Sequence, residues 1–581
     1  MPLDFVYRKV KNTLRKIDMK LTRAKYWHAD KLPQDIEFFD GSMYDAIYDA
    51  ACKWPHNTAL HYYDSEITYK ELIKKINKVA AALKALGVGR GDRVTVCMPN
   101  TPESIYMFYA INEIGAVANM VHPLSSEKEI EEYLIQSGSK VMLCIDITYP
   151  KVEAIIKNTE LEQVIVVSAT RSMDVLVRLI YKLTKGRKNH IKRSQHVLTW
   201  DKFLSKASRF VGNPHARVQS RDAAAILYSG GTTGKPKGVV LSNLSFNAEA
   251  LGAKYLIPDF MSPSNSFLTF LPNFHAFGLA ACIHAPLYCG LRVILIPQFN
   301  GKKLGRYITK YKPSVLVGVP AVFNHFVKLK FGKNDLKCIR WAFSGGDAIS
   351  MSTKEKVNDF LHAHGSSATV GIGYGLTEAT GGFILSTPDL AEEPDVLGYP
   401  LPGCETIIMD IKSHKKATPG KDGEILVRGV CVMKEYLGKP QETKAAFTMV
   451  GGKKYLRTGD VGYIDERGAV HFRSRLKRMI ISNGYNIYPA NVEDVTLKCS
   501  GVDTCAAVGQ EDKLRGEKVV VFIVAKPDAS ERAIRKELAS IYRKYLAKYE
   551  IPREIRFIDA LPKTKLAKVD FKALENCKKY T

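Results

Sequence analysis

The sequence predicts an α/β protein with a large N-terminal part and a smaller C-terminal part. Up to Asp395, apolar strand-like runs alternate with helix-like runs, which indicates largely parallel sheets covered by helices. Beyond Asp395 the pattern changes to short strands separated by glycine turns, which predicts a small β-rich unit. At 581 residues the chain is also too long for one hydrophobic core, so several domains are expected.

The α/β pattern occurs twice. The first copy has expected strands at 93–98, 141–145 and 164–167, a short apolar piece at 116–121, and helices at 102–114 and 127–136. The second copy has expected strands at 314–319, 340–344 and 369–374, with helix-like stretches between them. We therefore expect two α/β layers within one large domain.

The remaining elements lie toward the C-terminus. The β-rich unit has expected strands at 423–428, 461–464 and 469–472, of which the last two are joined by a turn at 465–468. A new α/β piece begins beyond residue 475. It includes an amphipathic helix whose apolar side chains are Ile534, Leu538, Ile541, Tyr545 and Tyr549.

The net charge is strongly positive, with 85 Lys and Arg against 59 Asp and Glu, and this favours anionic partners. Half of the excess of +26 lies in residues 1–31 and 171–193, which both carry apolar stripes. Basic amphipathic helices are typical of contact with an anionic membrane surface. No helix-turn-helix, zinc-finger or RNP-like string points to nucleic acid. The alternative is that both stripes pack on the protein body and leave their lysines in water.

Cysteine usage and the N-terminus indicate the compartment. Eleven cysteines are scattered singly, without Cys-x-x-Cys spacing, which fits reduced thiols in the cytoplasm. Charges recur every few residues from the N-terminus, so we expect no signal peptide, and no apolar run of about 18 residues could span a bilayer. We expect a cytoplasmic protein that contacts the inner face of the membrane peripherally.

A glycine-rich loop follows an expected buried strand at 224–227. Its residues are Ser229, Gly230, Gly231, Thr232, Thr233, Gly234 and Lys235, with Lys237 close behind. Glycines let backbone N–H groups face an anion, hydroxyls add hydrogen bonds or reach a metal, and lysines add positive charge, so the loop suits phosphate. It is not a Walker A motif, because Pro236 stands where Ser or Thr is required. On composition alone a flexible hairpin turn is the equal alternative.

Residues 228–238, Tyr-Ser-Gly-Gly-Thr-Thr-Gly-Lys-Pro-Lys-Gly, resemble the signature loop of the adenylate-forming superfamily of acyl- and aryl-CoA synthetases, NRPS adenylation domains and luciferases. Further motifs of that family follow in its order, so the resemblance covers roughly residues 40–575. Residues 1–40 form a basic leader, and the resemblance implies an N-terminal domain over 41–474 that binds AMP and the acyl group and a mobile lid over 475–581. It also implies ATP, Mg²⁺ and CoA as cofactors.

The resemblance also assigns roles around the nucleotide. His275, in the motif 271–278, would border the acyl pocket, although alone it reads as a core histidine. Gly345, Gly346 and Asp347 end an expected strand and would lie against adenine, as would Tyr374 and Gly375. Thr377 would bond the α-phosphate, and Glu378 would hold Mg²⁺ together with Thr233. For Thr377 and Glu378 the alternative is an ordinary helix start, with Thr377 as its cap.

The remaining assignments concern ribose and the lid. Asp460 would accept both ribose hydroxyls, although by itself it reads as a turn residue, and Arg475 would contact ribose or phosphate. Lys477 would occupy the hinge. Ser482, Asn483, Gly484 and Tyr485 would form a loop beside the pantetheine arm of CoA. Lys568 would neutralise charge on the α-phosphate as the carboxylate attacks, and its alternative is one solvated lysine in a basic tail.

The resemblance implies an ATP-dependent, AMP-forming acid–CoA ligase for a medium- or long-chain fatty acid. The chain length is inferred from the 171–193 segment, which resembles an insertion of fatty-acyl ligases, and from the basic leader. The alternatives are a fatty acyl-AMP ligase that loads a carrier protein, an aryl-acid ligase, and a non-catalytic membrane-bound relative that binds nucleotide or acyl groups. The chain departs from the family pattern at Asn243, Glu435, Ser474, Arg478, Leu566 and Ala567.

Overall fold

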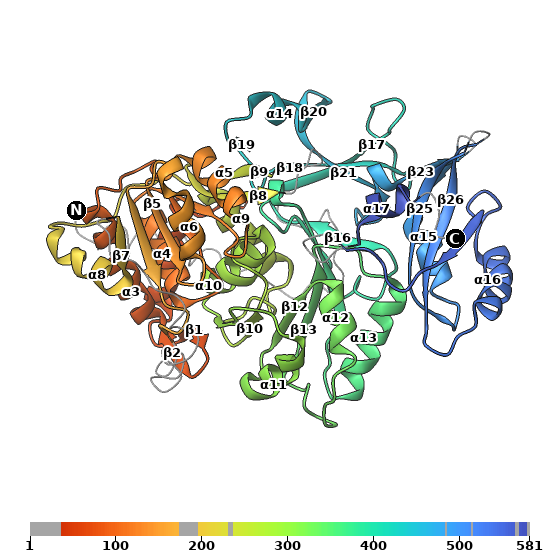
Figure 1. The fold of residues 1–581 in the computed structure, drawn as a ribbon, viewed down its shortest axis with the longest axis horizontal. Coiled ribbons are helices and arrows are strands. Elements are labelled where there is room, and N and C mark those ends of the chain that lie inside the picture. Colours follow the sequence, from red (N-terminus) through yellow and green to blue (C-terminus); the bar gives the residue numbers. More distant parts are fainter. Residues whose placement is uncertain are drawn as a thin grey trace.

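The structure is a computed structural model that describes residues 36–172, 196–229, 236–482, 485–512, 515–563 and 569–577 (Figure 1). It confirms the predicted α/β class, with a large N-terminal part and a smaller C-terminal part at one end of the molecule. The described strands form three sheets. Two of them belong to the N-terminal part, and the third is made by strands between residues 480 and 557.

The first sheet has eight strands in the order β19-β9-β8-β4-β3-β5-β6-β7. Its strands from β8 to β7 are parallel, whereas β9 is antiparallel to both β8 and β19. The strands are β3 (Arg93–Cys97), β4 (Val117–Met120), β5 (Val141–Ile145), β6 (Gln163–Val167), β7 (Val197–Thr199), β8 (Ala223–Ser229), β9 (Lys237–Ser242) and β19 (Glu435–Tyr436). The surrounding helices are α3 (Tyr69–Ala85), α4 (Pro102–Glu113), α5 (Glu127–Ser137), α6 (Tyr149–Ile155) and α8 (Trp200–Ser205).

The alternation of side chains along β5 shows why helices cover both faces of this sheet. Met142 and Cys144 pack in a cluster with α5 and α6, and Leu143 and Ile145 pack in the main core with α3 and α4. A strand that is apolar on both faces has to be covered on both, which is the usual state of a parallel sheet. The predicted strand at 141–145 therefore coincides with β5.

The second sheet is longer and joins a parallel half to an antiparallel half. Its order is β17-β18-β21-β22-β16-β15-β14-β13-β12-β10-β11-β1-β2, and β20 pairs with β21. Its strands are β1 (Thr58–Tyr62), β2 (Ser65–Thr68), β10 (Ser266–Thr269), β11 (Arg292–Leu295), β12 (Val315–Gly318), β13 (Trp341–Gly345), β14 (Val370–Tyr374), β15 (Ile384–Leu385), β16 (Val396–Pro400), β17 (Cys404–Met409), β18 (Gly423–Gly429), β20 (Phe447–Val450), β21 (Lys453–Ile464) and β22 (Val470–Arg475). The associated helices are α2 (Met43–Lys53), α9 (Asn243–Leu256), α10 (Ala285–Tyr288), α11 (Gly301–Tyr311), α12 (Pro320–Phe326), α13 (Met351–Ala363), α14 (Pro440–Ala445) and a π-helix over Phe277–His284.

The predicted β-rich unit proves to be an extension of this second sheet. Strand β16 pairs with β15 on one side and with β22 on the other, so the antiparallel strands continue directly from β14. The glycine turns seen in the sequence are present, but they connect strands of a shared sheet. The edge-to-edge pairing fixes the position of β21 and β22 relative to the end of β14.

Helix α9 lies between the two sheets of the N-terminal part. Phe246 and Ala248 pack in the core of the first sheet, whereas Ala253 and Leu256 pack in the core of the second. Its residues are buried almost all round, including the polar side chains Asn243, Asn247 and Glu249. At its start, Asn243 Oδ1 accepts the backbone N–H of Met43 across 2.9 Å, which gives one departure from the family pattern a structural role.

The C-terminal part has a five-stranded sheet in which β24-β23-β26-β25 are neighbours and β27 pairs with β26. Its elements are β23 (Ile480–Ser482), β24 (Tyr485–Ile487), β25 (Val502–Asp512), β26 (Gly516–Ala525), β27 (Glu554–Phe557), α15 (Pro489–Thr496), α16 (Glu531–Tyr545) and α17 (Phe571–Glu575). The predicted stripe on α16 is correct for Ile534 and Leu538 but wrong for Tyr545, which is exposed, and for Tyr549, which is exposed beyond the end of the helix. Tyr542 completes the buried stripe, because steps of four residues keep it on the face of Leu538.

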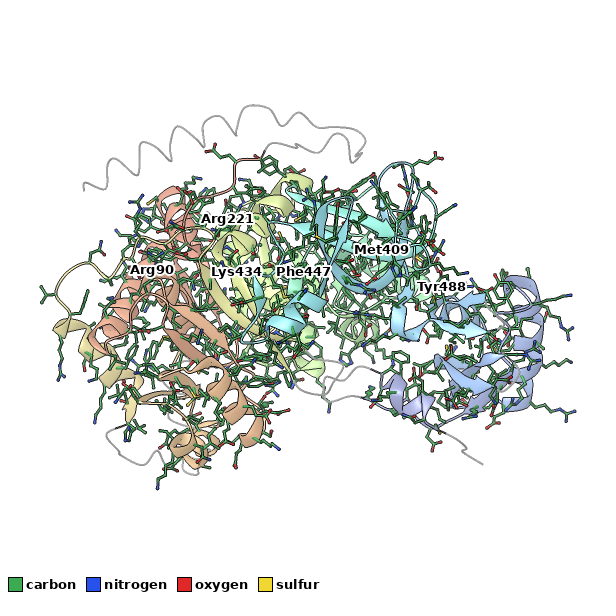
Figure 2. All side chains as sticks on the ribbon, turned by 90° about the horizontal axis from the view of Figure 1, so that it is seen from above. Arg90, Arg221, Met409, Lys434, Phe447 and Tyr488 are labelled. Atoms are coloured by element: carbon green, nitrogen blue, oxygen red, sulfur yellow. The ribbon has the colours of Figure 1, made fainter. Side chains whose placement is uncertain are left out.

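The two parts meet beside the antiparallel end of the second sheet. Tyr488, labelled in Figure 2, lies at this junction, and burial together with the Asp422 carboxylate raises the pKa of its hydroxyl. Three residues, Leu476–Arg478, form a short 3₁₀ turn between the end of β22 and the start of β23. The connection between the parts is therefore short.

The two basic segments fall mostly on residues 1–35 and 173–195, which lie outside the described residues. In the ranges that the structure describes, no helix has the length and apolar character needed to cross a membrane. All eleven cysteines belong to those ranges and are free thiols.

Candidate functional site

The candidate site lies where strands of both N-terminal sheets end. Strand β8 ends at Ser229, β13 ends at Gly345 and β14 ends at Tyr374. The carboxyl ends of parallel strands are the usual place for a ligand in open α/β sheets. Gly230 to Lys235, the rest of the predicted phosphate loop, lie outside the described residues, and Thr233 with them.

Glu378 links the two sheets through its side chain. Its Oε1 accepts a hydrogen bond from the Ser229 hydroxyl at 2.9 Å and another from the Tyr436 hydroxyl at 2.8 Å. The sequence predicted Ser229 and Glu378 for the same site, and the structure brings them together although 149 positions separate them. Tyr436 was missed. The only sequence signal was its place directly after Glu435, a departure from the family pattern.

Thr377 and Glu378 belong to a single 3₁₀ turn, Thr377–Ala379. The N-cap position of this turn is held by Leu376 and no side chain caps it, so the interpretation of Thr377 as a helix cap is wrong. The following Thr380 is buried and adopts φ of 66°, and its hydroxyl donates to the Cys431 carbonyl at 2.6 Å. A left-handed threonine is costly and persists only where its surroundings fix it.

Close backbone contacts explain two of the predicted glycines. A Cβ on Gly375 would lie 2.1 Å from the Gly381 carbonyl oxygen, so no side chain fits there. A Cβ on Gly345 would lie 2.6 Å from the Gly373 oxygen and 2.9 Å from the Phe277 ring. The end of β13 at Gly345 therefore packs directly against Phe277, in the segment that carries His275, and Gly381, which contacts Gly375, also lies against Ala276 of that segment.

His275 is half-buried, with its ring centroid 4.9 Å from that of Phe274. The fully buried histidine of this region is instead His284, which bonds Tyr109 and Asn247. Gly346 (φ 76°) and Asp347 follow β13 in the same turn as Gly345, and Asp347 is exposed with its Oδ1 accepting the N–H of Ala348. The motifs around His275, Gly345 and Tyr374 thus converge.

Asp460 is held between two neighbours. It faces Arg475 across the pair β21 and β22, with 3.1 Å between Asp460 Oδ1 and Arg475 Nε. The Tyr374 hydroxyl donates to Asp460 Oδ2 at 2.7 Å. Burial raises the pKa of Asp460, and the Arg475 charge opposes that shift. A carboxylate oxygen has more than one acceptor direction, so Asp460 retains capacity for hydroxyl donors.

Lys237, which follows the glycine-rich loop, forms an ion pair with Glu442. Its Nζ lies 2.7 Å from Glu442 Oε2 and 4.8 Å from the centroid of the Tyr436 ring. Hydrogen bonding from Lys237 lowers the pKa of Glu442. The positive charge of Lys237, directly behind the loop, is thus paired with the Glu442 carboxylate.

Some of the predicted lid residues are described by the structure and others are not. Lys477 is exposed in the turn between the two parts, and Ser482 pairs with Tyr485 and with Gly516 in the third sheet. Asn483, Gly484 and Lys568 lie outside the described residues.

The residues around Glu378 fit a magnesium ion. Among the described residues, no three His, Cys, Asp or Glu side chains gather as a metal cluster. Mg²⁺ retains water and takes phosphate oxygens, so a single protein carboxylate is often enough. The Glu378 carboxylate and the Ser229 hydroxyl supply oxygen atoms of the required kind beside the loop.

Comparisons with known proteins agree with this arrangement. A family model described as AMP-binding enzyme matches residues 47–437, and its C-terminal domain model matches residues 491–568. A long-chain-fatty-acid–CoA ligase of Bacillus subtilis (strain 168) is 29% identical over 94% of this chain and 96% of its own length. One of Haemophilus influenzae is 28% identical, covering 94% and 97%. The structure of the anthranilate CoA ligase AuaEII with anthranoyl-AMP has a TM-score of 0.77 at 24% identity, covering 95% and 99%, which shows a shared fold.

Proposed function

This chain belongs to the AMP-binding enzyme family, and on that premise we propose that it is an ATP-dependent, AMP-forming acid–CoA ligase for medium- or long-chain fatty acids. The fatty acid carboxylate attacks the α-phosphate of ATP, and pyrophosphate leaves. The CoA thiolate then attacks the acyl carbonyl of the adenylate, and AMP leaves. The observation that carries the proposal is the convergence of Ser229, Glu378 and the Tyr374–Asp460 pair at the strand ends.

The nucleoside is held by Asp460 and Tyr374. The Asp460 carboxylate accepts the ribose hydroxyls, and the Arg475 guanidinium beside it opposes the rise in its pKa that burial causes. The Tyr374 ring is fixed through its own hydroxyl, so its face is presented to adenine in one orientation. Gly345 and Gly346 leave space for the flat base on the other side.

The phosphates are held at Ser229, Thr377 and Glu378. Hydroxyls and backbone N–H groups at the end of β8 donate to phosphate oxygens. When bound at Glu378, Mg²⁺ supplies positive charge that offsets the charge of the phosphates and of leaving pyrophosphate. Thr377 donates to the α-phosphate, the centre at which negative charge builds during attack.

The C-terminal part acts as a lid whose hinge is Lys477. This proposal sets the domain boundaries at 41–474 and 475–581 and is supported by the short connection between β22 and β23. Lys568 faces the α-phosphate during adenylation. The turn of β23 and β24, with Ser482 at its start, then lies beside the pantetheine arm during thioester formation.

The acyl chain length and the membrane contact are proposed together. The relatives from Bacillus subtilis and Haemophilus influenzae are named for long-chain fatty acids. The free energy of transfer of such an acid from water to a membrane is favourable. Half of the net charge of +26 lies in the two basic segments, and such segments are attracted to anionic lipid. We propose a cytoplasmic enzyme that takes its acid from an anionic membrane surface.

A pyrophosphate-release assay tests the reaction. The full chain is incubated with ATP, Mg²⁺ and one of butanoic, octanoic, dodecanoic, hexadecanoic or benzoic acid, with and without CoA. We expect pyrophosphate and acyl-CoA with the medium or long acids. Pyrophosphate that never leads to acyl-CoA would indicate a carrier-protein ligase, benzoate preference an aryl-acid ligase, and no pyrophosphate from any acid would reject the proposal.

A further inference from the structure

Tyr436 touches the nucleotide site without belonging to a nucleotide motif. It lies on β19, which consists only of Glu435 and Tyr436 and pairs with β9. The side chain is 7% exposed, and its hydroxyl donates to Glu378 Oε1. A buried tyrosine hydroxyl requires a partner, but any carbonyl would satisfy it. Here the partner is the carboxylate oxygen that also accepts the Ser229 hydroxyl.

Tyr436 belongs to a segment over residues 430–445 that we term the strap. The strap binds the backbone of Glu378 as well, because the Met433 N–H donates to the Glu378 carbonyl at 2.8 Å. Two backbone hydrogen bonds join the strap to β9. The Lys434 N–H donates to the Val240 carbonyl, and the Leu437 N–H donates to the Gly238 carbonyl. Figure 2 shows Lys434 on the side of Arg221, whose carbonyl accepts the Lys434 ammonium at 2.8 Å.

An ion pair and a cation–π contact also hold the strap against β9. Lys237, at the start of β9, pairs with Glu442 of α14 and lies over the Tyr436 ring. The Tyr436 N–H donates to the Thr443 hydroxyl at 2.9 Å, so strand and helix hold each other. The ring of Tyr436 therefore has contacts that fix it independently of Glu378.

The donors on Glu378 leave one oxygen available. Both hydroxyls donate to Oε1, and among the described residues Oε2 accepts no hydrogen bond. Oε2 is thus the oxygen of Glu378 that remains for a further ligand.

We propose that Tyr436 is a positioning residue that orients Glu378 toward a divalent cation on the nucleotide phosphates. This inference rests on the proposed function, because it assumes that Glu378 meets a metal–nucleotide complex. Partners that orient a metal-ligating carboxylate typically contribute 10–100-fold to metal affinity. The Ser229 hydroxyl remains in Tyr436→Phe, so we expect a loss of about 10-fold.

The test measures Mn²⁺ binding directly. The full chain with saturating ATP and no acid is titrated with Mn²⁺, and free Mn²⁺ is read by electron paramagnetic resonance. Tyr436→Phe should raise the Mn²⁺ dissociation constant about 10-fold and leave the affinity for metal-free ATP, measured by calorimetry, unchanged. The matched control is Tyr455→Phe, which also removes a tyrosine–glutamate hydrogen bond, at 2.9 Å to Glu405, outside the site. It should leave both constants unchanged.

The outcomes separate the inference from the proposed function. If the wild-type chain binds no Mn²⁺–ATP, both fail. If wild type binds and Tyr436→Phe binds equally well, or both tyrosine variants weaken equally, only the positioning role is overturned. Should Tyr436→Phe not fold, Glu442→Gln keeps the hydroxyl and breaks the ion pair with Lys237. That variant should weaken Mn²⁺ by no more than about fivefold, and a larger loss would assign the orientation to the ion pair.

Discussion

Arg478 donates a hydrogen bond from its guanidinium to Glu493 Oε1 across 2.6 Å, and this pair joins the turn after β22 to helix α15. The same guanidinium lies 3.5 Å from the centroid of the Phe571 ring at the start of α17. Glu493 Oε1 also accepts the N–H of Ala507. Arg478 is one of the positions at which this chain departs from the family pattern, and here it forms a charge pair with Glu493.

We predict that Arg478→Met destabilises the C-terminal part. Loss of the guanidinium leaves the Glu493 carboxylate without its cation, and burial already raises the pKa of that group. The cost should be about 2 kcal/mol, between values typical of exposed and buried pairs. Calorimetric unfolding of the full chain measures it. The control is Arg515→Met, which removes the ion-pair partner of Asp512 elsewhere in the C-terminal part. An equal loss of stability in both variants would contradict the special role of Arg478.

Glu378→Gln should raise the Mg²⁺ concentration needed for adenylation and lower its maximal rate. The amide keeps an oxygen acceptor for Ser229 and Tyr436 but loses the charge that attracts the cation. The measurement is pyrophosphate release against Mg²⁺ concentration. Glu405→Gln is the control, since Glu405 also accepts a tyrosine hydroxyl but lies outside the site. A Mg²⁺ titration that is identical to wild type in Glu378→Gln would remove Glu378 from the metal site.

Lys568→Ala should separate the two half-reactions. If Lys568 faces the α-phosphate only during adenylation, the variant loses adenylate formation by about 10²–10³-fold. It should still convert supplied acyl-AMP and CoA to thioester. Lys563→Ala and Lys565→Ala are nearby controls. Normal adenylation by Lys568→Ala with a defect in Lys565→Ala would mean that the tail motif is aligned three residues out of register.

Glu113→Gln should stabilise the protein increasingly as pH rises. Burial, with the Asp45 charge, raises the pKa of Glu113 from 4.5 to about 8. The folded state therefore holds a proton that the unfolded state has released, and wild type loses stability as pH rises between about 4.5 and 8. The difference in melting temperature between variant and wild type should grow across that range and level off above it. A constant difference from pH 5 to 9 would contradict the raised pKa.

Deletion of residues 1–31 should weaken binding to anionic vesicles while sparing activity on a short soluble acid. Each Lys or Arg near such a surface contributes about 1 kcal/mol, and the attraction decays within a Debye length of about 8 Å at physiological salt. Vesicle sedimentation at two salt concentrations measures both the affinity and its salt dependence. Sedimentation that the deletion leaves unchanged would assign the leader no membrane role.

The sequence by itself determined the class of fold and several of its elements. The strand at 141–145 and the helix beginning at Pro102 could be predicted because apolar periodicity and helix-start residues are local signals. The glycine-rich loop and the motifs around His275, Tyr374 and Asp460 were recognised by their resemblance to a family pattern. Each of them is contiguous in the chain, so one stretch of sequence carries its whole pattern.

Only the tertiary structure decided which of these residues meet and what holds them. The hydrogen bond from Tyr436 to Glu378 and the ion pair between Glu442 and Lys237 join positions far apart in the chain. No local sequence pattern encodes the distance or direction between such partners. The pairing of β16 with β15 likewise decided that the β-rich strands extend the second sheet. Hydrogen bonds and ion pairs depend on separations of a few ångströms. Such separations are set by the packing of whole sheets, to which every strand contributes.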